Sequence, residues 1–180
     1  MVAFTSVAFA ATTLLGVTAA APKHIRSTGV VHRITAGSTA LAANGLRFDP
    51  ENIVAEIGDL IEFSFLPKNH TVVQSSFDKP CEPLASDNGV FSGFNFATAQ
   101  GLSNNTFVFE VKTKEPFWYY CSQTVGNHCQ MGMSGVVNQN FDGGKTLAKY
   151  KENSKGTVTV QPSADKLKSQ IGEIKPRKEL

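Results

Sequence analysis

The segment PFWYYCSQTVGNHCQMGMSGVVN, residues 116–138, contains two apolar runs separated by a polar loop. The first run, residues 116–121, is aromatic and continuous, as expected of a strand buried on both faces. Residues 134–138 are rich in small and β-branched side chains and are expected to form a second strand. The loop between two neighbouring strand ends is therefore predicted to turn its side chains back toward Cys121.

Four side chains in and near this segment have the chemistry of metal donors. Cys121, His128 and Met133 fall within thirteen residues, and His70 lies 51 positions before Cys121. Two imidazoles, a thiolate and a weak axial thioether form the donor set of a blue-copper electron-transfer site. Cu(I) favours soft sulfur and Cu(II) favours imidazole, so a mixed set reorganises little between the two oxidation states. The sequence predicts one type 1 copper ion held by these four residues.

Outward from this segment, several β-rich stretches are bounded by turn residues such as Gly58-Asp59. Strands are expected at residues 30–37, 46–57, 60–65, 71–75 and 106–111. The irregular stretch 78–102 is long enough to be functional or to hide short elements. About seven strands with almost no helical periodicity predict an all-β Greek-key sandwich.

The two ends of the chain differ from the β-rich part. Residues 1–20 carry no charge and end in small residues, which predicts a secretory signal peptide followed by a mobile lead-in, residues 21–29. The β domain is expected to span residues 30–141. Residues 143–180 hold 9 Lys/Arg against 4 Asp/Glu, whereas residues 21–142 hold 8 against 11. Residues 142–180 are therefore predicted to be a basic, mostly disordered tail.

These features narrow the partners and the location. The tail lacks the interleaved aromatic side chains of a nucleic-acid surface, so nucleic-acid binding is not expected. No segment after the signal is apolar and long enough to span a bilayer. The protein is expected to be secreted and extracellular, with attachment to the cell wall left open.

Three cysteines leave one thiol unpaired in an oxidising compartment. Spacing alone does not exclude a Cys121–Cys129 disulfide, which would remove the copper thiolate. A closed zinc site that uses Cys129 as a fourth donor is a second alternative. Met131 is a third alternative, because it could replace Met133 as the axial donor.

Several ordered motifs resemble those of the fungal extracellular cupredoxins, relatives of the plant phytocyanins, over roughly residues 30–140. The motifs are Phe48-x-Pro50-x-x-Ile53, Gly58-Asp59, Lys68-Asn69-His70-Thr71-Val72, Pro80-Cys81-x-Pro83-Leu84, Trp118-Tyr119-Tyr120-Cys121 and His128-Cys129-Gln130-x-Gly132-Met133. The resemblance implies a cupredoxin-type sandwich, copper ligands at His70, Cys121, His128 and Met133, and a Cys81–Cys129 disulfide. One departure is the loop between Cys121 and His128, which has six residues, two more than in plant phytocyanins.

Two glycosylation sequons occur in the chain. Asn69-His70-Thr71 is formally one, but a ligand role for His70 predicts that Asn69 is buried and hydrogen-bonded across to the Cys121 loop, where it supports the site. Asn104-Asn105-Thr106 precedes a strand in a polar loop, so Asn104 is the expected glycosylation site.

The expected function is that of a secreted, monomeric type 1 copper protein that carries one electron between redox partners, a protein or a small molecule. The alternative is an extracellular copper-binding or wall-associated protein without redox turnover. An enzyme is not expected: multicopper oxidases need a longer chain with paired histidines, and polysaccharide-oxidising copper enzymes need an N-terminal histidine. The predicted mature chain begins at Ala21.

Overall fold

The computed structural model describes residues 29–37, 45–86, 89–163, 165 and 171–178. The predicted signal peptide and all but residue 29 of the lead-in lie outside the described residues. Within the described part, no helix is long and apolar enough to cross a membrane.

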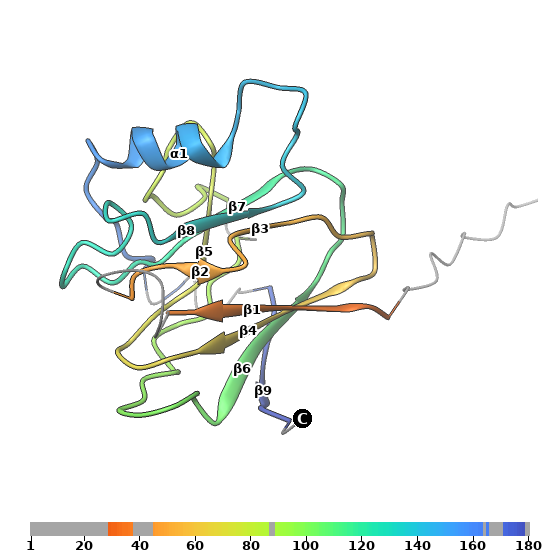
Figure 1. The fold of residues 1–180 in the computed structure, drawn as a ribbon, viewed down its shortest axis with the longest axis vertical. Coiled ribbons are helices and arrows are strands. Elements are labelled where there is room, and N and C mark those ends of the chain that lie inside the picture. The colour runs from red at the N-terminus through yellow and green to blue at the C-terminus, as the bar shows by residue number, and fades with distance from the viewer. Residues whose placement is uncertain (1–28, 38–44, 87–88, 164, 166–170, 179–180) are drawn as a thin grey trace, which may run out of the picture.

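Two mixed β-sheets pack face to face (Figure 1). The first has the spatial order β2 (Phe48–Asp49), β1 (Val31–Ala36), β4 (Leu60–Phe65), β6 (Asn105–Glu110) and β9 (Glu173–Pro176). The second has the order β3 (Asn52–Ile53), β8 (Ser134–Val137), β7 (Phe117–Tyr120) and β5 (Val73–Ser75). The β1–β4 and β3–β8 pairs are parallel and the other pairs are antiparallel. The predicted all-β sandwich is confirmed.

Alternation along the strands builds the core between the sheets. In β4, Ile61, Phe63 and Phe65 are buried, while the residues between them are half-buried. The Tyr119 ring of β7 packs edge-on against Phe63 across the sandwich, with ring centroids 5.3 Å apart. Large rings from both sheets thus interlock and fix the distance between the sheets.

The expectation of a mostly disordered segment after residue 141 is wrong for the described part of that range. Helix α1 (Leu147–Ser154) lies over the sheet that contains β8, and β9 pairs with β6 at the edge of the other sheet (Figure 1). The Thr146 side chain caps α1 by accepting the N–H of Lys149. Pro176 is tolerated because β9 is an edge strand. Burial of one face against the sandwich thus orders a helix of only eight residues.

Residues 78–102, which were expected to be irregular, are tied to the core. The Phe96 ring stacks on Phe65 at 4.0 Å, and isolated bridges join Lys68 to Thr98 and Val73 to Phe91. This connection therefore packs beside the chain that leads into and out of His70.

Candidate metal centre

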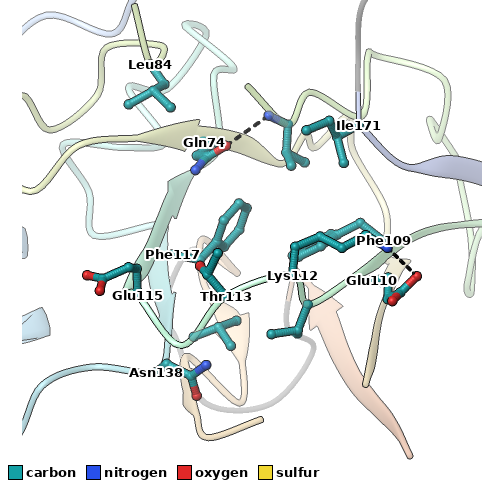
Figure 2. A pocket seen from close by; sticks show the side chains of 13 residues that line it. Gln74, Leu84, Phe109, Glu110, Lys112, Thr113, Glu115, Phe117, Asn138 and Ile171 are labelled. Atoms are coloured by element: carbon teal, nitrogen blue, oxygen red, sulfur yellow. Dashed lines mark hydrogen bonds and ion pairs between the residues drawn. The ribbon is translucent and has the colours of Figure 1, made fainter. Parts of the chain in front are cut away.

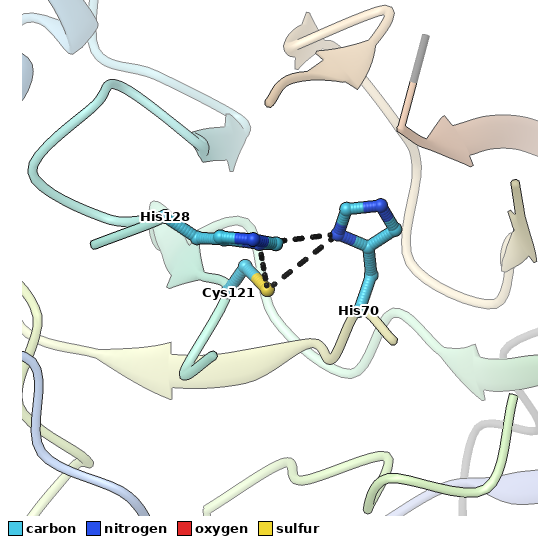
Figure 3. A group of neighbouring side chains, drawn as sticks. All are labelled: His70, Cys121 and His128. Atoms are coloured by element: carbon cyan, nitrogen blue, oxygen red, sulfur yellow. Dashed lines mark hydrogen bonds between the residues drawn. The ribbon is translucent and has the colours of Figure 1, made fainter. Parts of the chain in front are cut away.

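Three of the predicted donors meet at one end of the sandwich (Figure 3). His70 lies in the connection between β4 and β5, Cys121 directly follows β7, and His128 lies in the β7–β8 loop. The Cys121 Sγ lies 3.4 Å from His128 Nδ1 and 3.9 Å from His70 Nδ1, and the two Nδ1 atoms are 3.3 Å apart. All three side chains are buried. The fold therefore brings three donor atoms from segments far apart in sequence into one cluster.

The spacing of these atoms fits a single transition-metal ion. An ion bound at about 2.0 Å by two nitrogens and at about 2.3 Å by one sulfur, with all three in one plane, would need the nitrogens about 3.5 Å apart and the sulfur about 3.7 Å from each. The observed separations of 3.3, 3.4 and 3.9 Å lie close to these values. Each histidine turns Nδ1, rather than Nε2, toward the sulfur (Figure 3). The donor set and its geometry therefore match a trigonal site of two nitrogens and one thiolate sulfur.

The six-residue spacing between Cys121 and His128 is accommodated by a tightly hydrogen-bonded loop. The Cys121 N–H donates to the Met133 carbonyl at 3.0 Å, and the Met133 N–H donates to the His128 carbonyl at 2.9 Å. The His128 N–H donates to the Gln123 carbonyl at 3.2 Å, and Asn127 adopts a positive φ of 50°. These turns bring the His128 ring back over Cys121 despite the longer loop.

Thr71 joins the segment that contains His70 to the segment that contains Cys121. Its backbone N–H points at Cys121 Sγ at 3.4 Å, and its hydroxyl oxygen accepts the Ser122 N–H at 2.8 Å. Thr71 and Ser122 also share a hydroxyl hydrogen bond of 3.0 Å. Sequence reasoning missed Thr71, although its place directly after a candidate ligand was a signal. An N–H donated to the sulfur stabilises the thiolate that a metal requires.

The supporting role predicted for the Asn69 side chain is not observed. Asn69 is only half-buried, its side-chain Oδ1 has no hydrogen-bond partner, and its backbone carbonyl accepts the Gln123 side-chain amide at 3.3 Å. The His70 segment and the Cys121 loop are therefore connected by Thr71 and by the Asn69 backbone, and not by the Asn69 side chain.

Burial distinguishes the two methionines that could be the fourth donor. Its side chain is fully buried and belongs to the same core cluster as Cys121, whereas Met131 is 57% exposed. A thioether in solvent cannot be held against a buried thiolate. The alternative in which Met131 is the axial donor is thus disfavoured.

The disulfide joins Cys81 to Cys129, as the resemblance implied, and Cys121 is the free cysteine. This pairing removes the Cys121–Cys129 alternative. It also removes the zinc alternative, because the Cys129 sulfur is already bonded to carbon and sulfur and is not available as a thiolate.

Burial sets the protonation of the three donors. Burial lowers the pKa of His70, and burial together with the charges of His70 and Lys68 lowers the pKa of His128 to about 4. Burial raises the pKa of Cys121, against the opposing effect of N–H groups from Gln123 and Thr71. Without a metal the imidazoles are therefore neutral and ready to donate lone pairs, while the thiol needs a nearby cation to ionise.

Gly37, at the end of β1, leaves the space that the His70 ring occupies. A Cβ at Gly37 would lie 3.1 Å from His70 Nε2 and 3.0 Å from Leu66 Cβ, and Gly37 has a φ of +96°.

We expect Gly37→Ala to lower copper affinity about tenfold, because the added methyl group would displace the His70 ring from its supporting contacts. The strained backbone should also cost about 1 kcal/mol of stability. Copper titration and urea unfolding measure the two effects. Gly101→Ala is the matched control, because Gly101 has a φ of +61° and nothing within 4 Å of its Cβ position. Equal copper affinity in the two variants would contradict the prediction.

A separate hollow of about 190 Å³ opens near the other end of β7 (Figure 2). Its apolar walls include Leu84, Val90, Phe109, Val111, Phe117 and Val137. Phe117 begins β7 and Cys121 follows its last residue, so the hollow and the metal donors lie at opposite ends of that strand. Among the described residues, the only group of three or more His, Cys, Asp or Glu donors is the trio at the metal end.

The Asn104 side of the second sequon is accessible in the folded chain. Asn104 is exposed, whereas Thr106 is buried in β6, where it pairs with Lys175 of β9. Glycosylation at Asn104 remains a prediction.

Comparisons with known proteins find curated relatives from one fungus. No protein-family model matches the chain. The chain is 33% identical over 117 residues to "Probable GPI-anchored cupredoxin-1" of the fungus Arthroderma benhamiae, which covers 65% of this chain and 57% of the relative. It is 36% identical over 111 residues to "Extracellular serine-rich protein" of the same fungus, covering 62% and 41%. The chain thus spans about half the length of these curated relatives.

Solved structures with a similar course of the chain include native pseudoazurin from Hyphomicrobium denitrificans. It is 20% identical, covers 72% of this chain and 100% of that chain, and has a TM-score of 0.43. Reduced auracyanin from Roseiflexus castenholzii is 15% identical, covers 62% and 96%, and has a TM-score of 0.40.

Proposed function

We propose that this chain, which is 33% identical over 117 residues to a probable GPI-anchored cupredoxin of a fungus, is a type 1 copper protein that carries one electron between redox partners. The observation that carries the proposal is the convergence of the His70 and His128 Nδ1 atoms on Cys121 Sγ. Met133 is the proposed fourth, weak donor. Copper, when bound, supplies the Cu(II)/Cu(I) couple.

The residues around the donors perform three tasks in this proposal. The hydrogen-bonded loop and the Thr71–Ser122 link hold the donors in one arrangement, so that little movement accompanies a change of charge. Burial of all three donors excludes water from the sulfur. Once a bound cation has ionised the Cys121 thiol, the Thr71 N–H that points at the sulfur would stabilise the thiolate. A preorganised, dry site suits rapid electron transfer.

The remaining parts of the proposal concern location and partners. A signal peptide at residues 1–20 would direct the chain out of the cell. Glycosylation at Asn104 would be consistent with that route. The names of the two fungal relatives support a place outside the cell or at its surface. We propose a monomer that exchanges electrons with a protein or a small molecule.

Spectroscopy and voltammetry of the mature, copper-loaded chain test this function. Intense blue absorption with a reversible one-electron wave is the expected result. Binding of Cu(II) without reversible cycling would favour the alternative of a copper-binding or wall-associated protein. Absence of intense visible absorption in the loaded protein would overturn the type 1 assignment.

Replacement of Met133 with leucine should keep the blue colour and raise the reduction potential. The reason is that loss of a weak axial sulfur leaves the three strong donors in place and removes a donor that tunes the potential. Voltammetry measures the shift. Met131→Leu is the matched control and should leave the potential unchanged, because Met131 is 57% exposed. A shift in the Met131 variant alone would assign the axial role to Met131.

A further inference from the structure

The chain after β8 folds back over the metal end of the sandwich. We call residues 146–160 the strap. Helix α1 anchors it: Tyr150 stacks on Trp118 with ring centroids 5.4 Å apart and planes 5° from parallel. Leu147 packs into the same buried cluster as Val136. The helix is thus fixed on the sheet that contains both strands flanking the ligand loop.

From this anchor, the strap reaches the residue that precedes the Cys121 ligand. The Tyr120 hydroxyl donates to the Val160 carbonyl at 2.6 Å, and the Val160 N–H donates to the Cys81 carbonyl at 2.9 Å. The Tyr120 side chain is fully buried. The strap therefore holds Tyr120 from one side while β5 and β8 hold it through the sheet.

The same strap reaches the two residues that follow the His128 ligand. The Thr159 hydroxyl donates to Gln130 Oε1 at 2.7 Å, and Gln130 Nε2 donates to the Thr157 hydroxyl at 3.3 Å. The Ser154 hydroxyl donates to the Lys151 carbonyl within the helix at 2.8 Å, and its oxygen lies 3.5 Å from the Cys129 carbonyl oxygen. Thr159 is only 8% exposed, so its hydrogen bond is largely shielded from water.

We propose that the strap is a positioning element of the metal centre. It holds Tyr120, which precedes Cys121, and Gln130, which follows His128 by two residues, and it thereby fixes the separation of Cys121 and His128. Because the donor geometry tunes a copper centre, the strap sets the reduction potential from a segment that supplies no donor. This inference rests on the proposed copper function and adds the residues that adjust it. If the strap only completed the core, its loss would lower stability and leave the potential unchanged.

The first arm of the test needs no copper. In the metal-free protein, Thr159→Val should speed hydrogen exchange of the amides of residues 121–133 about fivefold, the factor for one net hydrogen bond. Tyr120→Phe should act similarly, and the double variant should exceed either. Thr159→Ser keeps the hydroxyl and should restore slow exchange. Thr113→Val, at an exposed site in the β6–β7 connection, is the control and should have no effect. Unchanged exchange in the double variant would overturn the inference.

The second arm uses the copper-loaded protein. Thr159→Val should shift both the reduction potential and the ratio of the visible absorption bands, whereas Thr159→Ser and Thr113→Val should keep the natural values. Faster exchange with an unchanged potential and spectrum would reduce the strap to a purely structural role and overturn the proposal. Failure of the natural chain to bind copper would instead contradict the proposed function. The hydrogen-exchange experiment uses metal-free protein, so its result does not depend on that function.

Discussion

Replacing Cys121 with serine should abolish the intense visible absorption and lower copper affinity more than about 100-fold, because loss of even an outer partner of a ligand costs 10–100-fold. A serine hydroxyl does not ionise under conditions where a metal-bound thiol does. The fold should survive, because serine is similar in size and can accept the Thr71 N–H that now points at the sulfur. Copper titration followed by visible absorption measures the loss, and thermal unfolding of the metal-free protein measures the stability.

A Cys121→Ser protein that remained blue would contradict the assignment. The other two cysteines form the disulfide, so no second thiolate is available to replace the lost one. Unfolding of the metal-free variant at a much lower temperature would show instead that Cys121 has a structural role.

Removal of the disulfide should lower the stability and leave the colour unchanged, whereas Cys121→Ser should abolish the colour and leave the fold intact. The double change Cys81→Ala and Cys129→Ala should lower the free energy of unfolding by about 4 kcal/mol in the metal-free protein, because the bridge closes a span of 48 residues. That loss is a large part of the stability of an ordinary domain. Urea unfolding at low temperature measures it.

The colour of the double variant is the control for this prediction. Cys121 is retained and the alanines leave no new thiol to pair with it, so the folded, copper-loaded variant should stay blue. A stability loss below about 1 kcal/mol would contradict the entropic account of the bridge. Loss of the colour with the fold intact would mean that the disulfide itself positions His128, its neighbour in sequence.

Much of this architecture was predictable because local patterns and donor chemistry agree. The turn residues Gly58-Asp59 and the alternation after them predicted a strand at residues 60–65, and β4 has those bounds. The spacing of sulfur and imidazole side chains predicted the trio His70, Cys121 and His128, which the structure brings together. The likeness to fungal cupredoxins rested on these same motifs and is confirmed by a curated fungal relative.

The parts that were missed depend on contacts between distant residues. Strand β9 pairs Lys175 with Thr106, and its four residues, Glu173–Pro176, contain one β-branched side chain and end in a proline, so they give little local signal for a strand. Helix α1 buries only Leu147, Tyr150 and Ser154, a stripe too short to stand out. The role of Gly37 in leaving space for the His70 ring becomes visible only when the two residues are seen together. In each case the partner, rather than the local sequence, decides the conformation.

The separation of His70 and Cys121 along the chain has a consequence for how the protein would acquire copper. The two donors are 51 residues apart, so an unfolded chain presents no preformed site and folding must precede tight capture of the ion. The bound ion would then act as a second staple beside the disulfide. By mass action, the folded state would gain about 4 kcal/mol at a free copper concentration a thousand times the dissociation constant. Persistence of the protein outside the cell would therefore follow the supply of copper.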